Sequence, residues 1–297
     1  MTKRIVSVSG GKDSTALYLW AIEQWGKDGF LSVFADTGHE HPVTYNYLRN
    51  LPAMANGPEI AWVKANFTDK VRAKGIEPQN SPFIDMWLWK GRAPSARAQF
   101  CTEHLKLRPI QAWLEGWRKD SDIVEMYVGI RAAESERRSK MPPQEWSDMY
   151  ECDVFRPLLT WTEEEVWAML SKHNVPPNPL YQHGSARVGC YPCIHSRKSE
   201  LASMPDWAWE KLAHWEKLAG RTWFSFGDIP LTNDQKLELK KAQGNDTLTA
   251  ELKDRFSPRV MEVREWTKTS RGGKQFDMFA ADSADVPTCM STWGVCE

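Results

Sequence analysis

The chain has 297 residues, of which 41% are hydrophobic and 11% aromatic, and its 38 Lys and Arg nearly balance its 39 Asp and Glu. This composition excludes an intrinsically disordered chain, and a pI near 6.7 excludes an overall basic coat for nucleic acid. No apolar run approaches the roughly 18 residues of a membrane span and no signal peptide follows Met1, so we expect a cytoplasmic protein with no membrane partner. In a reducing compartment, six Cys favour metal or thiol chemistry over disulfides.

The first elements in chain order alternate between strands and helices. Strands are expected over residues 5–8, 31–35 and 59–63, helical patterns follow the first two, and a later strand is expected over residues 124–130. Strand-helix units joined by short loops indicate parallel strands with right-handed crossovers. We therefore expect an α/β fold with a Rossmann-like open, mainly parallel sheet and helices on both faces.

The second half of the chain is expected to be mostly helical. Thr162 and Glu165 form a capping pattern, and the Pro-rich residues 175–179 indicate a boundary. Further helices are expected over residues 198–218, 234–256 and 258–267. The predicted division is a nucleotide-binding α/β domain over residues 1–175 and a Cys-bearing, helical region with a flexible tail over residues 176–297.

A glycine-rich loop lies between the first strand and the first helix. Residues 9–14 read Ser-Gly-Gly-Lys-Asp-Ser. Glycines let the backbone approach an anion, successive N–H groups and the helix N-terminus attract it, and the lysine adds a full charge. The spacing is neither the Walker A pattern nor the dinucleotide-binding turn. A phosphate site is favoured over a plain Gly-Gly turn, with the residues Ser9, Gly10, Gly11, Lys12, Asp13 and Ser14.

This loop resembles the pyrophosphate loop of the adenine-nucleotide α-hydrolase superfamily, and the best match within it is the phosphoadenosine phosphosulfate (PAPS) reductase family. Residues 35–40, 129–138 and 156–158 are similar to further signatures of that family, so the resemblance covers roughly residues 4 to 200. It implies an adenine nucleotide as ligand, either ATP or the sulfonucleotides PAPS and adenosine phosphosulfate (APS). It also adds Asp36, Thr37 and Arg131 to the expected nucleotide-binding residues.

These added residues have simpler interpretations. Asp36 at a strand end could cap a turn, and Arg131, Arg137 and Arg138 could form a solvated face interleaved with acidic residues. Arg131 is favoured as a ligand of phosphate or sulfate, because it directly follows a strand and so reaches the carboxyl edge of the sheet.

Cys190 and Cys193 have the two-residue spacing that lets both sulfurs face one metal. The family resemblance adds Cys101, although Thr102 stands where cluster-containing reductases have a second cysteine. We expect a [4Fe-4S] cluster on these three, with Cys289 as the candidate fourth ligand and Cys296, Cys152 or an open position as alternatives. The other interpretations are zinc on the same residues, with His104, His195 or another Cys completing the set, and free thiols. Cys152 itself favours a structural role.

The tail ends in Val-Cys-Glu, which is similar in position but not in order to the catalytic motif at the C-terminus of the reductases. Cys296 is therefore a candidate nucleophile, against the simpler interpretation of an incidental thiol in a terminal segment. Lys12 and Asp13 are the other candidate catalytic residues. The lysine favours ATP cleavage, since sulfonucleotide reductases typically lack it and it can stabilise a leaving pyrophosphate together with Mg²⁺.

Three functions follow. The first is an oxidoreductase that reduces a sulfonucleotide with a thioredoxin-type reductant; the second is an ATP-dependent sulfur transferase that adenylates a nucleic acid for thiolation. The third is a nucleotide-sensing protein without turnover. Nucleic-acid binding stays open, because Trp residues such as Trp113 with Trp117 lie at spacings that serve helix packing equally well. The sequence does not give the oligomeric state.

Overall fold

Five parallel strands and one antiparallel strand form a single open sheet. The computed structural model of the protein describes residues 2–119, 121–244 and 247–271. The strands are β1 (Thr2–Ser7), β2 (Leu31–Ala35), β3 (Ile60–Val63), β4 (Ile123–Tyr127), β5 (Gln144–Ser147) and β6 (Cys152–Phe155). They are ordered β3-β2-β1-β4-β6-β5, and every neighbouring pair is parallel except β5 with β6. The expected mainly parallel α/β sheet is confirmed, although β5 and β6 were not predicted.

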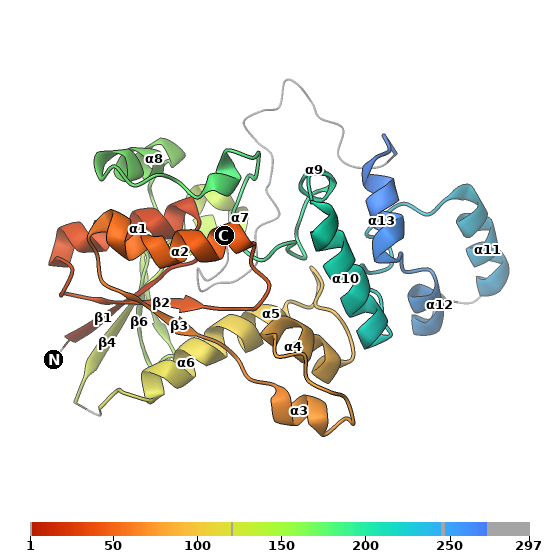
Figure 1. The fold of residues 1–297 in the computed structure, drawn as a ribbon, viewed down its shortest axis with the longest axis horizontal. Helices are drawn as coiled ribbons and strands as arrows, with labels where there is room; N and C mark the ends of the chain where they lie inside the picture. The colour runs from red at the N-terminus through yellow and green to blue at the C-terminus, as the bar shows by residue number, and fades with distance from the viewer. Residues whose placement is uncertain (1, 120, 245–246, 272–297) are drawn as a thin grey trace.

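Helices cover both faces of this sheet, as predicted. In Figure 1, α1, α2 and α8 lie on one face and α6 on the other. The helices of the first half are α1 (Lys12–Trp25), α2 (Pro42–Ala55), α3 (Thr68–Arg72), α4 (Pro82–Lys90), α5 (Phe100–Thr102), the π-helical η1 (Glu103–Leu107) and α6 (Arg108–Glu115). Those that follow β4 are the 3₁₀ turn η2 (Ala132–Glu134), α7 (Glu136–Ser139), α8 (Glu163–Lys172), η3 (Pro179–Tyr181), α9 (Lys198–Ala202), α10 (Asp206–Ala219), α11 (Asn233–Gln243), α12 (Ala250–Arg255) and α13 (Val260–Thr267).

Two hydrophobic cores flank the sheet because successive strand residues point to opposite faces. Val6 and Phe34 pack against α1 and α2. Ile5 and Val33, their neighbours in sequence, pack against α6 on the other face. Both faces are therefore apolar, which explains why the strands read as continuous hydrophobic runs.

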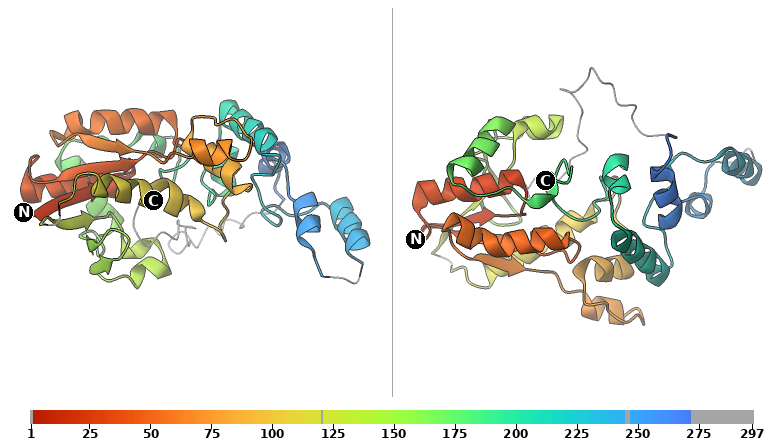
Figure 2. Two further views of the ribbon diagram at one scale, coloured as in Figure 1. Left: turned by 90° about the horizontal axis from the view of Figure 1, so that it is seen from below. Right: turned by 45° about the horizontal axis from the view of Figure 1, so that its top comes forward.

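A third core lies beyond the carboxyl ends of the strands. Phe83 and Trp87 of α4 pack there with Trp209 and Trp215 of α10 and Val260 of α13. In Figure 1 these C-terminal helices stand on the side of the sheet to which the strands point, and Figure 2 shows α11 and α12 at the far end of the described chain. The helical extension thus shares a core with a segment of the first half.

Two of the predicted helices are interrupted. The helix expected over residues 198–218 divides into α9 and α10, because Pro205 occupies the N-cap of α10 and cannot donate an intrahelical hydrogen bond. The stretch expected over residues 234–256 ends its first helix before Gly244, which has a φ of 58°, and resumes at α12. Gly244 adopts a positive φ at little steric cost, which terminates α11.

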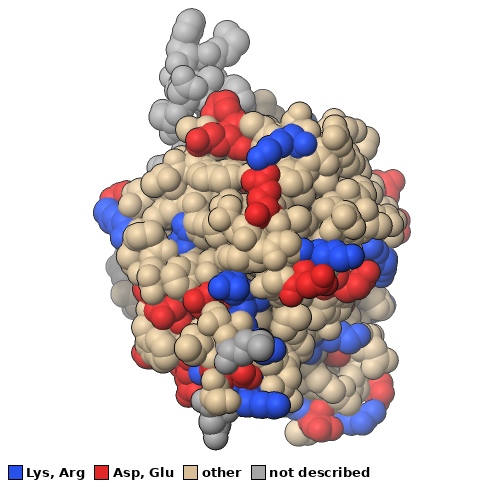
Figure 3. Space-filling view, turned by 90° about the vertical axis from the view of Figure 1, so that its left-hand side faces the viewer, with Lys and Arg blue, Asp and Glu red and all other residues tan. Residues whose placement is uncertain are grey.

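The surface at the amino ends of the strands has no single sign of charge. Figure 3 shows acidic and basic side chains interspersed on that face, in keeping with the net charge of −1. Within the described chain, no helix combines the length and apolar character needed to cross a membrane.

Candidate nucleotide and sulfur site

The glycine loop lies where the sheet reverses its winding. From β1 the chain moves to β2 and β3 on one side, and β4 then pairs with the other side of β1. Crossovers diverge at such a point and leave a crevice at the carboxyl ends of the strands, where open α/β sheets bind ligands. The loop follows β1 and the segment containing Arg131 follows β4, so the topology brings both to this crevice.

Backbone geometry explains the glycines of the loop. Gly10 has a φ of 85°, and a Cβ there would lie 3.0 Å from Cγ2 of Thr44. Ser14 Oγ accepts a hydrogen bond from the N–H of Ser9 at 3.1 Å and donates to the carbonyl oxygen of Gly11 at 3.1 Å. The loop is therefore folded onto the N-terminus of α1, where the partial positive charge of the helix favours an anion.

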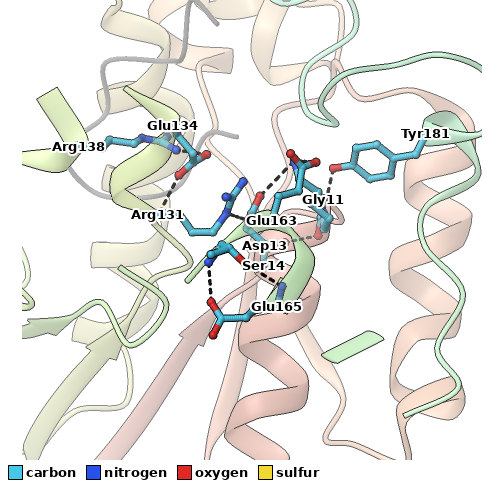
Figure 4. Close-up of polar contacts among 11 residues, drawn as sticks. Gly11, Asp13, Ser14, Arg131, Glu134, Arg138, Glu163, Glu165 and Tyr181 are labelled. Atoms are coloured by element: carbon cyan, nitrogen blue, oxygen red, sulfur yellow. Dashed lines mark hydrogen bonds and ion pairs between the residues drawn. The ribbon is translucent and has the colours of Figure 1, made fainter. Parts of the chain in front are cut away.

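Four charged side chains meet beside the loop (Figure 4). Arg131 Nε donates to Asp13 Oδ1, and the two side chains are 6% and 1% exposed. Lys12 Nζ lies 3.5 Å from Asp13 Oδ2 and 3.8 Å from Glu163 Oε1 of α8. The structure therefore brings together three predicted residues, Lys12, Asp13 and Arg131, and adds Glu163, which carried no recognisable signal in the sequence.

One N–H group of the glycine loop already donates a hydrogen bond to another part of the chain. The N–H of Lys12 donates to the hydroxyl of Tyr181 at 2.9 Å, and Lys12 Nζ lies 5.5 Å from the centre of the Tyr181 ring. Asn178, 1% exposed, donates from Nδ2 to the carbonyl oxygen of Gly10 at 3.1 Å. The segment with η3 thus packs over the glycine loop. The Tyr181 hydroxyl accepts a hydrogen bond from an N–H group that could otherwise donate to a phosphate oxygen.

Residues 35–40, which resemble a signature of the reductase family, form a turn that is stabilised by their own hydrogen bonds. Asp36 Oδ1 accepts hydrogen bonds from the N–H of Gly38 at 2.9 Å and from the Tyr45 hydroxyl at 2.7 Å. Burial raises the pKa of Tyr45, and the Glu40 and Asp36 carboxylates add to this effect. The capping interpretation of Asp36 describes these contacts, while a role of Asp36 in nucleotide binding stays a prediction.

The cysteine loop, which we define as residues 190–193, packs against residues 35–40. Cys190 pairs with Glu40 as an antiparallel bridge, and the N–H of Tyr191 donates to the carbonyl oxygen of His39 at 2.6 Å. Cys190 Sγ lies 3.7 Å from Thr37 Oγ1 and 3.7 Å from Glu40 Oε1. Thr37, predicted to bind nucleotide, is fully buried and donates to Glu40 Oε1 at 2.7 Å. Its hydroxyl therefore supports the cysteine loop.

A half-buried lysine of α10 also contacts this segment. Lys211 Nζ of α10 lies 3.2 Å from His39 Nδ1 and donates to the carbonyl oxygen of Tyr191 at 3.3 Å. Burial lowers the pKa of Lys211 to about 8, and burial together with Lys211 holds the pKa of His39 well below its usual range. His39 is therefore neutral at pH 7, and α10 fixes the position of the cysteine loop.

A pocket separates the glycine loop from the cysteine loop. It is lined by Ser9 of the first, by Gly189 beside the second, and by Glu40 and the buried Lys106 between them. A second pocket lies behind the cysteine loop and is lined by Cys190 and Cys193. A phosphate bound at the glycine loop would thus be separated from the cysteine loop only by this pocket.

Among the described residues, the expected metal ligands Cys101, Cys190 and Cys193 do not form a coordination set. Cys101 is half-buried and packs against the third core, as do Tyr191 and Ile194. Cys190 contacts Thr37 and Glu40. In the part of the chain that the structure describes, no three His, Cys, Asp or Glu side chains are arranged to hold a metal ion. Cys289 and Cys296 lie outside the described residues. The described residues alone therefore do not fit a cluster or a zinc ion.

Cys152 and Arg138 are buried in the fold. Cys152 lies in β6, is 2% exposed, and burial raises the pKa of its thiol to about 11. Arg138, 3% exposed, pairs with Glu134, which also accepts a hydrogen bond from the N–H of Arg131 at 2.7 Å. These contacts hold the turn that carries Arg131, so the solvated-face interpretation does not apply to Arg138.

Comparison with known proteins agrees with this site. The family model for the phosphoadenosine phosphosulfate reductase domain matches residues 3–196. An uncharacterized 37.8 kDa protein of Escherichia phage 186 is 36% identical over all of this chain and 97% of its own length. Adenosine 5'-phosphosulfate reductase of Allochromatium vinosum is 34% identical over 38% of this chain, and the match spans only 42% of that enzyme.

Solved structures add a distant likeness. The phosphoadenylyl-sulfate reductase of Candida auris is 20% identical, with a TM-score of 0.44 over 64% of this chain and 82% of its own. The family model covers well over half of the chain and includes the glycine loop, the Arg131 segment and the cysteine loop. The chain therefore belongs to the phosphoadenosine phosphosulfate reductase domain family.

Proposed function

We propose that this protein is an enzyme that binds an adenine nucleotide at the glycine loop and carries out sulfur chemistry on it, by reducing a sulfonucleotide such as PAPS or APS. The observation that carries the proposal is the convergence of three distant segments. The loop, the buried Asp13–Arg131 pair and the docked cysteine loop all meet at the carboxyl edge of the sheet. Family membership and the similarity to an APS reductase support the sulfur chemistry.

In this proposal the loop N–H groups and Lys12 bind the phosphate that leaves. A cysteine thiolate attacks the sulfur, the bond between sulfur and the phosphate oxygen breaks, and the nucleotide departs with that oxygen and its electron pair. A thioredoxin-type dithiol then reduces the resulting cysteine S-sulfonate, is itself oxidised to a disulfide, and releases sulfite. Cys296 is the proposed nucleophile on the strength of its resemblance to the family motif.

A second candidate is ATP-dependent thiolation of a nucleic acid. The observation that favours it is Lys12, whose ammonium group lies within 3.8 Å of both Asp13 and Glu163 at the loop. A fixed cation there would stabilise the charge that develops on a leaving pyrophosphate, with Mg²⁺ as the expected partner ion. A sensor that binds nucleotide without turnover is the third candidate.

One anaerobic assay distinguishes these functions. The purified protein is incubated with ATP, and separately with PAPS or APS plus thioredoxin, and both pyrophosphate and sulfite are measured. Sulfite without pyrophosphate supports reduction, whereas pyrophosphate without sulfite contradicts it and supports the ATP-dependent enzyme. Binding of nucleotide with neither product supports the sensor.

The [4Fe-4S] cluster stays a prediction that metal analysis tests directly. Iron and acid-labile sulfide in stoichiometric amounts would support it, and Cys190→Ser and Cys193→Ser should then lose iron. Stoichiometric zinc without sulfide would support the zinc alternative, in line with the ligand preferences of that ion. Loss of neither metal in these variants would show that the cysteine loop does not bind metal.

Lys12→Ala tests the role of the loop lysine. We expect it to weaken triphosphate use roughly 10- to 100-fold, the range of a lost charge-assisted contact of about 1.5–3 kcal/mol, and to affect monophosphate binding much less. Lys27→Ala, which removes an exposed lysine just beyond α1, is the matched control and should change neither. Equal losses for triphosphate and monophosphate with Lys12→Ala would contradict the role assigned to it.

A further inference from the structure

A cluster of cations on aromatic rings lies on α3, α4 and α5, outside the site described above. We name it the Trp89 surface and define it by Phe67, Lys70, Trp89, Lys90, Arg92 and Phe100. Lys70 Nζ and Lys90 Nζ lie 4.2 Å and 4.1 Å from the centre of the Trp89 ring. Arg92 Cζ lies 5.5 Å from the centre of the Phe100 ring, and Phe67 stacks on Trp89 at 5.4 Å. Each cation is therefore held in place by a ring.

The surrounding chain carries a local excess of positive charge. Residues 64–108 contain nine Lys and Arg but only four Asp and Glu, in a protein whose net charge is −1. One of those acids, Asp85, is 3% exposed, and another, Glu103, pairs with Arg108. The positive potential here is thus local and not a property of the whole surface.

The cations of the Trp89 surface are not neutralised by the fold. Within residues 2–119, 121–244 and 247–271, no carboxylate lies within ion-pair distance of Lys70, Lys90 or Arg92. All three are exposed. A lysine fixed against a ring loses less conformational entropy when it binds an anion than a freely moving one. The arrangement is therefore suited to several anions bound at once.

The composition of the surface selects the kind of partner. A protein interface needs exposed apolar anchors at its centre, but the large exposed hydrophobic side chains of the described chain lie elsewhere, on other elements such as β3 with Trp62 and α10 with Trp207. The half-exposed rings of Trp89 and Phe100 instead lie beside the cations. Rings beside a line of cations are typical of surfaces that bind unpaired bases and phosphates together.

We propose that the Trp89 surface binds the backbone of single-stranded nucleic acid, with phosphates at Lys70, Lys90 and Arg92 and bases against the edges of the rings. The short helix η1 connects this surface to the nucleotide crevice. His104 of η1 lies 5.1 Å from the Trp89 ring, and Lys106, two residues on, lines the pocket beside Ser9. A bound strand would therefore end near that pocket. The inference does not depend on the proposed function, because binding requires no turnover.

Fluorescence anisotropy with a labelled oligothymidylate tests the proposal. Three phosphate contacts on a single strand give a slope of about −2 for log K against log salt, so affinity should fall roughly 15-fold between about 50 and 200 mM salt. The variant Lys70→Glu/Lys90→Glu/Arg92→Glu should bind at least about tenfold more weakly and lose most of this slope. The single variants Lys90→Ala and Arg92→Ala should each reduce the slope by about 0.7.

Lys236→Glu/Lys240→Glu/Lys241→Glu is the matched control, because it makes the same charge change on the exposed face of α11. It should bind oligothymidylate like the unmodified protein. Lys12→Ala should also bind it normally, so that a failure at the glycine loop and a failure at this surface are distinguishable. Three outcomes would each overturn the proposal. They are equal oligothymidylate affinity of the two triple variants, competition by polyglutamate as strong as that by unlabelled oligothymidylate, and tighter binding of duplex DNA than of oligothymidylate.

Discussion

Asp13 shows how strongly one buried carboxylate constrains the loop. It is 1% exposed, Arg131 donates to its Oδ1, and Lys12 lies 3.5 Å from its Oδ2. A buried carboxylate costs several kcal/mol of desolvation unless cations and donors surround it. The loop therefore holds two cations close together, which prepares the crevice for an anion.

Arg131→Gln should destabilise the fold because it leaves that carboxylate with a neutral partner. We expect a loss of about 3–5 kcal/mol in the free energy of unfolding, measured by urea denaturation. Asp13→Asn/Arg131→Gln should recover a large part of this loss, since neither group is then charged. A single variant as stable as the unmodified protein would contradict the ion pair.

Cys152 makes stability depend on pH in the alkaline range. Burial raises the pKa of its thiol from the usual 9.0 to about 11. Because the folded chain keeps this proton while the unfolded chain loses it, the folding constant should fall as pH rises between 9 and 11, by at most tenfold per pH unit. Cys152→Val should lack this part of the alkaline loss. Identical pH profiles for both proteins from denaturation experiments would contradict the raised pKa.

At the scale of elements, the contact between β4 and α1 depends on a missing side chain. A Cβ on Gly129, just beyond β4, would lie 3.1 Å from the carbonyl carbon and oxygen of Asp13. These are backbone atoms of α1, so they cannot give way without moving the helix and the loop. Gly129 therefore sets how closely residues 129–138 and the glycine loop approach each other.

Gly129→Ala should separate α1 from β4 and loosen the loop. We expect a destabilisation of about 1–3 kcal/mol and weaker nucleotide binding, measured by thermal unfolding and by titration with ATP. Gly116→Ala at the end of α6 is the control, because a Cβ there meets no atom closer than 3.5 Å. Unchanged nucleotide affinity in Gly129→Ala would show that the loop tolerates the shift.

At the scale of the whole molecule, Glu216 of α10 joins the C-terminal helices into one unit. Its two carboxylate oxygens accept hydrogen bonds from the N–H of Trp223 at 3.0 Å and of Val260 at 3.1 Å. Burial raises the pKa of this carboxyl above its usual value. The third core then links the same helices to α4, which follows β3. The division at residues 175 and 176 stays a prediction, since both parts contribute to this core.

Glu216→Gln should weaken this assembly because its amide nitrogen cannot accept one of the two hydrogen bonds. A buried N–H left without an acceptor costs about 1–3 kcal/mol, so the thermal transition should shift to lower temperature. Since α4 shares the core, we expect fluorescence and far-ultraviolet circular dichroism to report one common transition. Glu210→Gln, on the exposed face of α10, should leave it unchanged. Separate transitions would contradict a shared core.

The sequence by itself determined the glycine loop, the mainly parallel sheet and the caps of single helices. Each of these depends on residues within about one strand-helix unit, as the Thr162–Glu165 capping box at the start of α8 illustrates. β5 and β6 escaped prediction because they are only four residues each and carry polar side chains such as Gln144 and Asp153. A short half-polar strand is stabilised by its neighbour in the sheet and not by its own pattern.

Only the tertiary structure decided which groups meet at the crevice. Arg131 pairs with Asp13 across 118 positions of sequence, and Tyr181 reaches the N–H of Lys12 across 169. Cys190 contacts Glu40 across 150 positions. No local periodicity encodes such contacts, because they follow from the order of the strands and from how the C-terminal helices pack on α4. The physical reason is that side chains at the ends of separate elements are positioned by the cores of the sheet and helices beneath them.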